Sequence, residues 1–216
     1  MSWLQKRPQV SNPTLFFNAN NESTKLIVGL GNIGDDYRQT RHNIGFQCLD
    51  NFILNYEEFN QTWTLKKDLN GLISTGLINN KKCILLKPTT MMNNSGLAVR
   101  LVSSYYKILP ENIIIIHDEL DLPFGRIKTQ SGGRDAGHNG IKSITDNIKT
   151  ENYNRVRIGI QNELSDKTDT SDFVLANFSK SEMQHIPNLF KEVSSIISEF
   201  IFGIGPLPTE NRNFIV

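Results

Sequence analysis

The sequence predicts a single-domain α/β protein with a twisted, mixed β-sheet flanked by helices and a functional crevice at the C-terminal ends of its strands. Strand-like apolar runs alternate with segments of helical period along most of the chain. Three short strand candidates also follow one another between 62 and 87, as hairpin neighbours do, which makes the sheet mixed. With 216 residues and no linker or repeat, residues 25–216 suit one domain.

The first 24 residues differ in composition from the rest. They contain Pro8 and Pro13, are rich in Ser, Thr and Asn, and lack the apolar core of a signal peptide. We predict that residues 1–24 form a disordered N-terminal extension. Lys6 and Arg7 precede the first acidic residue, which leaves organelle targeting open, although we expect a cytoplasmic protein. No run approaches the roughly 18 apolar residues of a membrane helix, so no membrane partner is expected.

The first half of the chain predicts strands and helices in a definite order. A strand over about 25–30 is followed by a polar loop and a helix over about 44–58. The three strand candidates come next, at 62–66, 72–78 and 82–87. A second helix begins with Asn94 or Ser95 as its N-cap. It should pack on the sheet through one face, formed by Leu97, Leu101, Val102 and Tyr105.

The second half contains the clearest strand. Four consecutive isoleucines, 113–116, indicate a central strand buried on both faces, with His117, Asp118 and Glu119 at its C-terminal end. The polar segment 162–172 gives no periodic signal. The other predicted elements are a strand at 126–130, a glycine-rich loop at 131–140, a helix from about His138, a strand at 155–161 and a helix over about 179–202.

The motif "GLGNIG" at 29–34 matches the GxGxxG pattern of a dinucleotide-binding turn. Such a site needs a helix that starts at the third glycine and an acid after a second strand. Here the third glycine leads into "DDYRQTRHN", which lacks helical period, and Asp50 falls inside the helix that follows. A nucleotide-dependent oxidoreductase is therefore a rival hypothesis, but the sequence lacks the helix start and the acid that its cofactor site requires. We interpret the glycines as a tight turn that brings Asn32 and His42 to the crevice.

Polar side chains gather in the loops that follow the strands. If these loops meet, they bring together His42, Asp118 and the carboxamides of Asn32, Asn93 and Asn139. An imidazole can take a proton from water at neutral pH, and a carboxylate can orient it. A covalent nucleophile is disfavoured because no GxSxG is present. Hydrolysis by activated water is therefore the predicted chemistry.

The two cysteines predict neither a disulfide nor a metal site. Cys48 and Cys83 lie in apolar surroundings without CxxC or Cys/His spacing, so buried free thiols are expected. We expect no metal and no cofactor.

Charge is unevenly distributed although the net charge is only +1. The segment 126–157 is locally basic, which is typical of a nucleic-acid contact and also of a solvated face. Charge alone does not separate these two interpretations.

Three blocks of the sequence together resemble the bacterial-type peptidyl-tRNA hydrolase family. They are "GLGNIGDDYRQTRHNIG", "KPTTMMNNSG" and "HDELDLPFGRIK" running into "GHNGIKSI", with "RVRIGI" as a weaker fourth, and the similarity covers roughly residues 25–200. The resemblance implies a catalytic domain over 25–216 that cleaves the ester between peptide and tRNA in peptidyl-tRNA and N-blocked aminoacyl-tRNA, and so recycles tRNA. We expect a monomer.

The resemblance assigns roles to particular residues. His42 would activate water, and Asp118 would orient the His42 imidazole. Asn32 and Asn93 would hold the peptide end and the reacting carbonyl. Asn139 would position water or the nucleic-acid end of the substrate. Tyr37 and Met92 would line the crevice. The candidates for tRNA phosphate contacts are Lys128 and Arg157, at positions the family uses, and Arg134 and Lys142, on local charge alone. A non-hydrolytic RNA-binding relative is the rival, and it would lack His42 or its partner.

Overall fold

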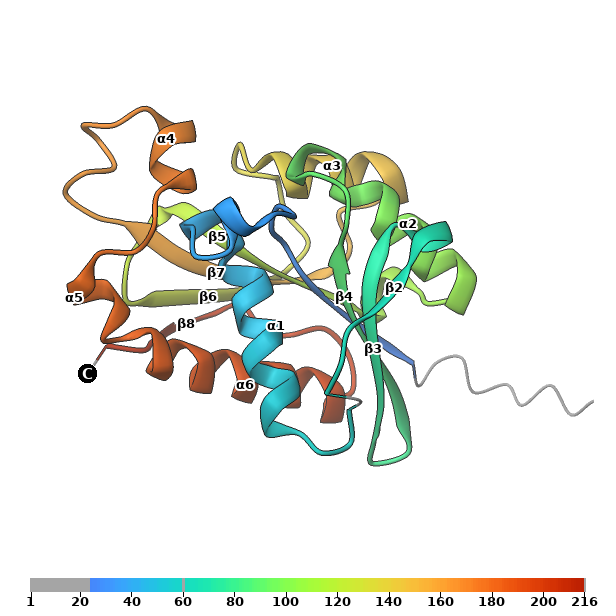
Figure 1. Cartoon of the computed structure of the whole chain (residues 1–216). Coiled ribbons are helices and arrows are strands. Elements are labelled where there is room, and N and C mark those ends of the chain that lie inside the picture. The colour runs from blue at the N-terminus through green and yellow to red at the C-terminus, as the bar shows by residue number, and fades with distance from the viewer. Residues whose placement is uncertain (1–23, 60, 216) are drawn as a thin grey trace, which may run out of the picture.

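The computed structural model describes residues 24–59 and 61–215, so the predicted extension lies outside the described residues except for Thr24 (Figure 1). The described part forms one mixed eight-stranded sheet in the order β2-β3-β4-β1-β5-β7-β6-β8. Helices cover both faces of this sheet. The predicted fold class is confirmed.

Parallel strands form the centre of the sheet and antiparallel strands form its flanks. β1 (Lys25–Gly29) lies between β4 (Lys81–Pro88) and β5 (Ile113–Pro123) and is parallel to both. β2 (Thr64–Lys66), β3 (Gly71–Ile78) and β4 form the predicted antiparallel run.

Beyond β5, β7 (Asn154–Gln161) runs parallel to it, and β6 (Arg126–Ser131) is antiparallel to β7. The sheet ends at β8 (Glu210–Asn213), which the sequence did not predict. Its residues, ENRN, alternate between half-buried and exposed but are all polar, so they give no apolar period.

The isoleucines of β5 explain its central place. Ile114 and Ile116 face the core under α1 (Ile44–Asn55) and α6 (Ile186–Phe202). Ile113 and Ile115 face the other core, under α2 (Ser95–Tyr106) and α3 (Asn139–Ile148). Because successive side chains of a strand point to opposite faces, four apolar residues in a row fit only a strand covered on both sides.

β5 is longer than predicted. It continues past Glu119 to Pro123 by pairing with β7, with a register shift between those two residues. His117–Glu119 therefore do not end the strand. They lie just beyond its last pair with β1, Gly29 with Ile116. The sheet opens at this point because β1 stops there, and the crevice forms at the end of β1.

Several helices differ from their predicted bounds. α1 ends at Asn55, and the predicted helix over 179–202 is divided into α5 (Lys180–Met183) and α6, which has a proline in its first turn. α4 (Thr170–Leu175) starts inside the polar segment that gave no signal. Within the described residues no helix combines the length and the apolar character needed to cross a membrane.

The predicted packing face of α2 is wrong in part. Val102 is buried, but Leu97 and Leu101 are only partly buried and Tyr105 is exposed. The buried side consists mainly of small residues because α2 packs against α3: a Cβ at Gly96 would lie 2.0 Å from the carbonyl oxygen of Ser143. A close contact between two helices requires small side chains, whereas the usual apolar stripe of a helix consists of large ones.

The glycines of "GLGNIG" serve packing more than turning. Gly34 alone among them has a positive φ, 115°, at the start of the short 3-10 turn η2 (Asp35–Tyr37). A Cβ at Gly29 would lie 2.3 Å from the carbonyl oxygen of Gly45, and one at Gly31 would lie 2.7 Å from Cγ of Phe46. The start of α1 therefore fills the space that side chains at these two positions would need. The tight-turn interpretation holds only for Gly34.

Candidate active site

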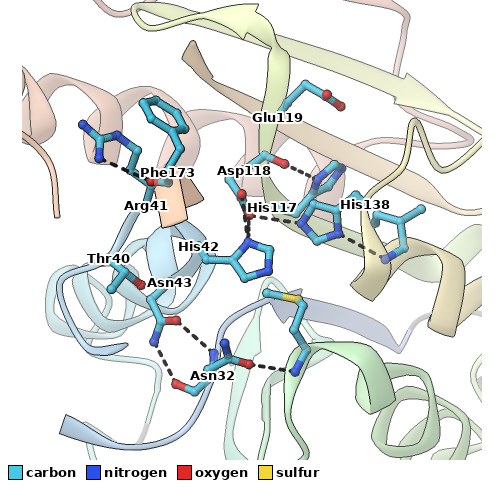
Figure 2. A network of polar contacts seen from close by, with 12 residues as sticks. Asn32, Thr40, Arg41, His42, Asn43, His117, Asp118, Glu119, His138 and Phe173 are labelled. Carbon is cyan, nitrogen blue, oxygen red and sulfur yellow. Dashed lines mark hydrogen bonds and ion pairs between the residues drawn. The ribbon is translucent and has the colours of Figure 1, made fainter. Parts of the chain in front are cut away.

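His42 and Asp118 are in direct contact. His42 belongs to the 3-10 turn η3 (Arg41–Asn43), and its Nδ1 lies 2.9 and 3.0 Å from the two carboxylate oxygens of Asp118 (Figure 2). Because a carboxylate can only accept, Nδ1 carries the proton. The other ring nitrogen, Nε2, is left as a base on the side of the ring away from Asp118.

A second imidazole binds the same carboxylate. Nε2 of His138 lies 3.1 Å from Oδ1 of Asp118, while its Nδ1 accepts a hydrogen bond of 3.3 Å from the backbone N–H of Ile141. His138 is thus the N-cap of α3, and the cap fixes the tautomer in which Nε2 donates to Asp118. The sequence predicted one imidazole here and missed His138. Its place beside Asn139 in the block "GHNG" was the available signal.

Burial and charge oppose each other in this cluster. Burial alone would raise the pKa of Asp118, but His42 and His138 hold that pKa far below its usual range. Burial alone would lower the pKa of His42, but the charge and hydrogen bond of Asp118 outweigh it and raise the pKa above 6.5. Asp118 therefore stays ionised.

The ring of His117 packs edge-on against that of His138, with the ring centres 4.7 Å apart, but it bonds the backbone of Asp118 and not the carboxylate. It is completely buried, and burial followed by the charge of His138 holds its pKa well below 6.5, so its ring is neutral. Its Nδ1 donates to the backbone oxygen of Asp118 at 2.7 Å, whereas its Nε2 has no hydrogen-bond partner among the described residues.

Asn32 is clamped between two segments (Figure 2). Its backbone N–H donates to Oδ1 of Asn43 at 2.9 Å, and its backbone oxygen accepts from Nδ2 of Asn43 at 2.8 Å. Its side-chain oxygen accepts from the backbone N–H of Met92 at 2.8 Å. Nδ2 of Asn32 makes no hydrogen bond within the described part of the chain, so it remains a donor held in a fixed position.

A cleft of about 640 Å³ joins these groups. All seven predicted catalytic and substrate-binding residues line it: Asn32, Tyr37, His42, Met92, Asn93, Asp118 and Asn139. The sequence did not predict the rest of the lining, which includes Glu119, Leu120, His138 and part of the segment 169–175.

Arg41 connects that unpredicted wall to His42. It is 3% exposed, and its guanidinium donates to Glu182 at 2.9 Å and to the backbone oxygen of Asn177 at 2.8 Å. The group also lies over the rings of Phe173 and Phe178. The neighbour of His42 in the chain thereby anchors α4 and α5.

The four predicted tRNA contacts do not line the cleft. Lys128 and Arg157 are cross-strand partners on β6 and β7, and Arg157 donates to Glu119 at 2.7 Å. Arg134 is exposed in the loop after β6, and its carbonyl is held by buried Arg155 at 2.8 Å. Lys142 is exposed on α3. Of the four, only Lys128 and Arg157 are direct neighbours within the described residues.

His42, Asp118 and His138 are also a set that could hold a metal ion. Their ligand atoms lie within 4.8 Å of one another, and two imidazoles with one carboxylate suit a divalent transition metal. In the present arrangement the nitrogens that face Asp118 carry protons, which an ion would have to displace.

The fold and the site define a class of protein: an α/β protein whose open cleft contains an imidazole oriented by a buried carboxylate, an arrangement suited to general base chemistry. The model of the peptidyl-tRNA hydrolase family matches residues 26–210. The chain belongs to this family.

Individual relatives agree along most of their length. A peptidyl-tRNA hydrolase of Mycoplasma mycoides is 44% identical over 191 residues, which cover 88% of this chain and 96% of the relative. One from Rickettsia prowazekii is 44% identical over 176 residues, covering 80% and 92%. The crystal structure of peptidyl-tRNA hydrolase from Acinetobacter baumannii matches with a TM-score of 0.76 and 36% identity, over 83% of this chain and 89% of that one.

Proposed function

We propose that this chain hydrolyses the ester bond between peptide and tRNA in peptidyl-tRNA and in N-blocked aminoacyl-tRNA, by means of a water molecule that His42 activates. The observation that carries the proposal is the contact of His42 with Asp118 inside the cleft of a chain that belongs to this family. Release of the peptide would return the tRNA to translation.

The proposed reaction begins with proton transfer. Nε2 of His42 takes a proton from water as the water oxygen attacks the ester carbonyl. The C–O bond to the 3′ oxygen of the ribose then breaks, and the imidazolium returns the proton to that oxygen. One water is consumed, and the products are a peptide with a free carboxyl group and a tRNA with a free 3′ hydroxyl. Asp118 stabilises the imidazolium while remaining ionised.

Two carboxamides would assist the carbonyl. Nδ2 of Asn32 is a free donor whose position is fixed by Met92 and Asn43, so it can stabilise the developing oxyanion without taking the proton. Asn93 would hold the peptide end beside it. Tyr37 and Met92 would contact the substrate, and Asn139, the first residue of α3, would position water or the end of the nucleic acid.

The tRNA would approach over the basic residues beyond Asn139. Lys128, Arg134, Lys142 and Arg157 would contact phosphates, which position the RNA without reading its sequence. We further propose that the protein acts as a cytoplasmic monomer without cofactor, metal or membrane partner.

The first prediction concerns His42. Release of free tRNA from N-acetylaminoacyl-tRNA should fall by a factor of about 10² to 10⁴ in His42→Ala, which is the contribution of general base catalysis. Binding of tRNA should change little. His185→Ala is the matched control, because that imidazole makes no side-chain cap bond and lines none of the cleft.

The same assay with a chelator separates the alternatives. Full activity with chelator is expected. Loss of activity with chelator would instead point to an ion bound by His42, Asp118 and His138. A folded wild type that binds tRNA and leaves the ester intact would be a binding relative, and the proposed function would be wrong.

A further inference from the structure

Two surface hollows lie along α1, and the first of them adjoins the cleft. The first, of about 780 Å³, shares Asn32 with the cleft and extends past Asn43 to Asn51 and Phe190. The second, of about 690 Å³, shares Asn51 and Phe190 with the first and lies between α1 and α6. We treat these two adjoining hollows as one depression, here called the α1 trough.

The trough is suited to a neutral chain of mixed side chains. Exposed Ile33, Leu54 and Met183 line its first hollow, where a bound chain could cover them with apolar side chains of its own. The lysine of this first hollow, Lys87, is neutralised by Asp50 at 2.5 Å and lies 4.3 Å from the ring centre of Trp63.

The charges of the trough differ from those proposed for RNA. Its first hollow has two acids, Asp35 and Asp50, and two bases, Arg38 and Lys87, whereas the second has Lys191. None of the four cations proposed to contact tRNA lines either hollow. Arg134 and Lys142 flank in the chain the wall of the cleft formed by residues 136–139, and Arg157 bonds Glu119 of the cleft lining, whereas the trough adjoins the cleft at Asn32. A phosphate chain would gain little in the trough.

Three carboxamides lie along the trough at helical spacing. Gln47, Asn51 and Asn55 are four residues apart on α1 and therefore form one stripe about 12 Å long. Within the described residues, Oε1 of Gln47, Nδ2 of Asn51 and Oδ1 of Asn55 make no hydrogen bond, although the opposite end of Gln47 donates to Thr40 and that of Asn55 to Asn51. This stripe offers acceptor, donor and acceptor groups in succession.

We infer that the α1 trough binds the peptide part of the substrate, about three or four residues beyond the ester, as an extended chain. This inference rests on the proposed function. An extended peptide rises about 3.3 Å per residue, so four residues match the length of the amide stripe. Carboxamides can pair with the backbone of any peptide, so the stripe recognises peptides without regard to their sequence. The trough thus favours peptidyl-tRNA over an aminoacyl ester that has no further residues.

The test compares substrates that differ only in peptide length. N-acetylaminoacyl-tRNA and peptidyl-tRNAs of two, four and six residues would carry the same tRNA and the same esterified amino acid. The wild type should hydrolyse the longer substrates with increasing kcat/KM up to about four residues and then level off. The double variant Asn51→Ala, Asn55→Ala should lose about tenfold in kcat/KM on the longer substrates, through KM, and little on N-acetylaminoacyl-tRNA. Alanine favours the helix, so the fold is retained.

The control is Asn188→Ala, which removes an exposed carboxamide of α6 that lines none of the three cavities. Equal losses on all substrates would show that the double variant acts through the reacting centre, and a flat length dependence would place the peptide elsewhere. Either result overturns the inference while the proposed function stands. Absence of hydrolysis on every substrate would instead refute the proposed function.

A second measurement locates the peptide directly. The His42→Ala variant would retain a peptidyl-tRNA whose fourth residue from the ester carries a benzophenone side chain. Photocrosslinks should map to residues 47–55 of α1 or to Phe190. Crosslinks confined to residues 131–142 would mean that the peptide shares the basic wall with RNA, and the inference would be wrong.

Discussion

The carboxylate of Asp118 is shared by two imidazoles of different kinds. The side chain of His42 is 13% exposed, and its free nitrogen faces the cleft. Both nitrogens of His138 are bonded, one to the backbone N–H of Ile141 as the helix cap and one to Asp118. His42 is therefore free to exchange a proton, and His138 is restricted to holding the carboxylate. A buried ionised group is tolerated here because two imidazole N–H groups donate to it.

The pH dependence of the reaction follows from this contact. As a base, His42 must be neutral, and its pKa is raised above 6.5, so the rate should fall as the pH drops through that raised value. Asp118→Asn removes the charge that raises the pKa and leaves burial, which lowers it. We expect the acidic limb of kcat/KM to move to lower pH and the plateau to fall about a hundredfold.

Profiles of wild type and Asp118→Asn between about pH 5 and 9 measure this shift. Asp121→Asn, an exposed acid on the same strand, serves as the control. An acidic limb that stayed in place would mean that a group other than His42 limits the rate.

The sequence was informative about residues near the end of β1. Asn32 and His42 could be placed in one crevice with Asp118 because their loop follows β1, and Asp118 lies on the neighbouring β5 just beyond the last pair of the two strands. His138 could not, because its role depends on a bond to Ile141 that exists only once α3 has formed. Position in the chain predicts that these side chains lie close together, whereas the tautomer of His138 depends on contacts that form only in the folded protein.

Among the elements, α4 depends most on a partner elsewhere in the chain. It has six residues, too few to be stable alone, and only Phe173 of them is buried. Arg41 fixes it from η3 by bonding the backbone oxygens of Phe173 and Asn177 and the carboxylate of Glu182. One wall of the cleft is therefore stabilised from beside His42.

Arg41→Lys should loosen this wall. A lysine ammonium cannot bond Glu182 and both backbone oxygens together, so we expect a loss of about 1–3 kcal/mol in unfolding free energy. Amide exchange and protease cleavage should accelerate within residues 162–178. Arg100→Lys, an exposed change on α2, is the control. Unchanged protection of 162–178 would show that α4 is held by its apolar contacts instead.

The sequence predicts an element best where all of its side chains are buried in the same kind of environment. β5 could be recognised because its isoleucines are covered on both sides. α4 and β8 could not, because tertiary partners stabilise them and their own sequences are polar. The packing face of α2 was misjudged because Gly96 and Ala98 let α3 come close, and small residues contribute little to an apolar pattern.

Charge acts at the scale of the whole molecule. The net charge of +1 does not attract RNA by itself, so binding has to rely on the local basic surface. Reversing Arg134 and Lys142 to glutamate should weaken tRNA binding and reduce the slope of log affinity against log salt by about 1.5, corresponding to two lost phosphate contacts. Fluorescence titration at several salt concentrations measures the slope.

Lys66→Glu with Lys67→Glu is the control for this change, since these exposed cations lie at the far edge of the sheet. A slope that fell equally in both double variants would indicate a general charge effect. Arg134 and Lys142 would then be removed from the proposed interface.

The strand order β5-β7-β6 has a consequence for synthesis on the ribosome. β6 is made directly after β5, yet the strands it pairs with are β7 and β8, which are made later. Until Gln161 has left the exit tunnel, the strand that carries Asp118 has an open edge and β6 has no strand to join. A nascent chain that stalls before that residue therefore exposes an unpaired edge and has no complete site. Activity should appear only late in elongation, after most of the chain has emerged.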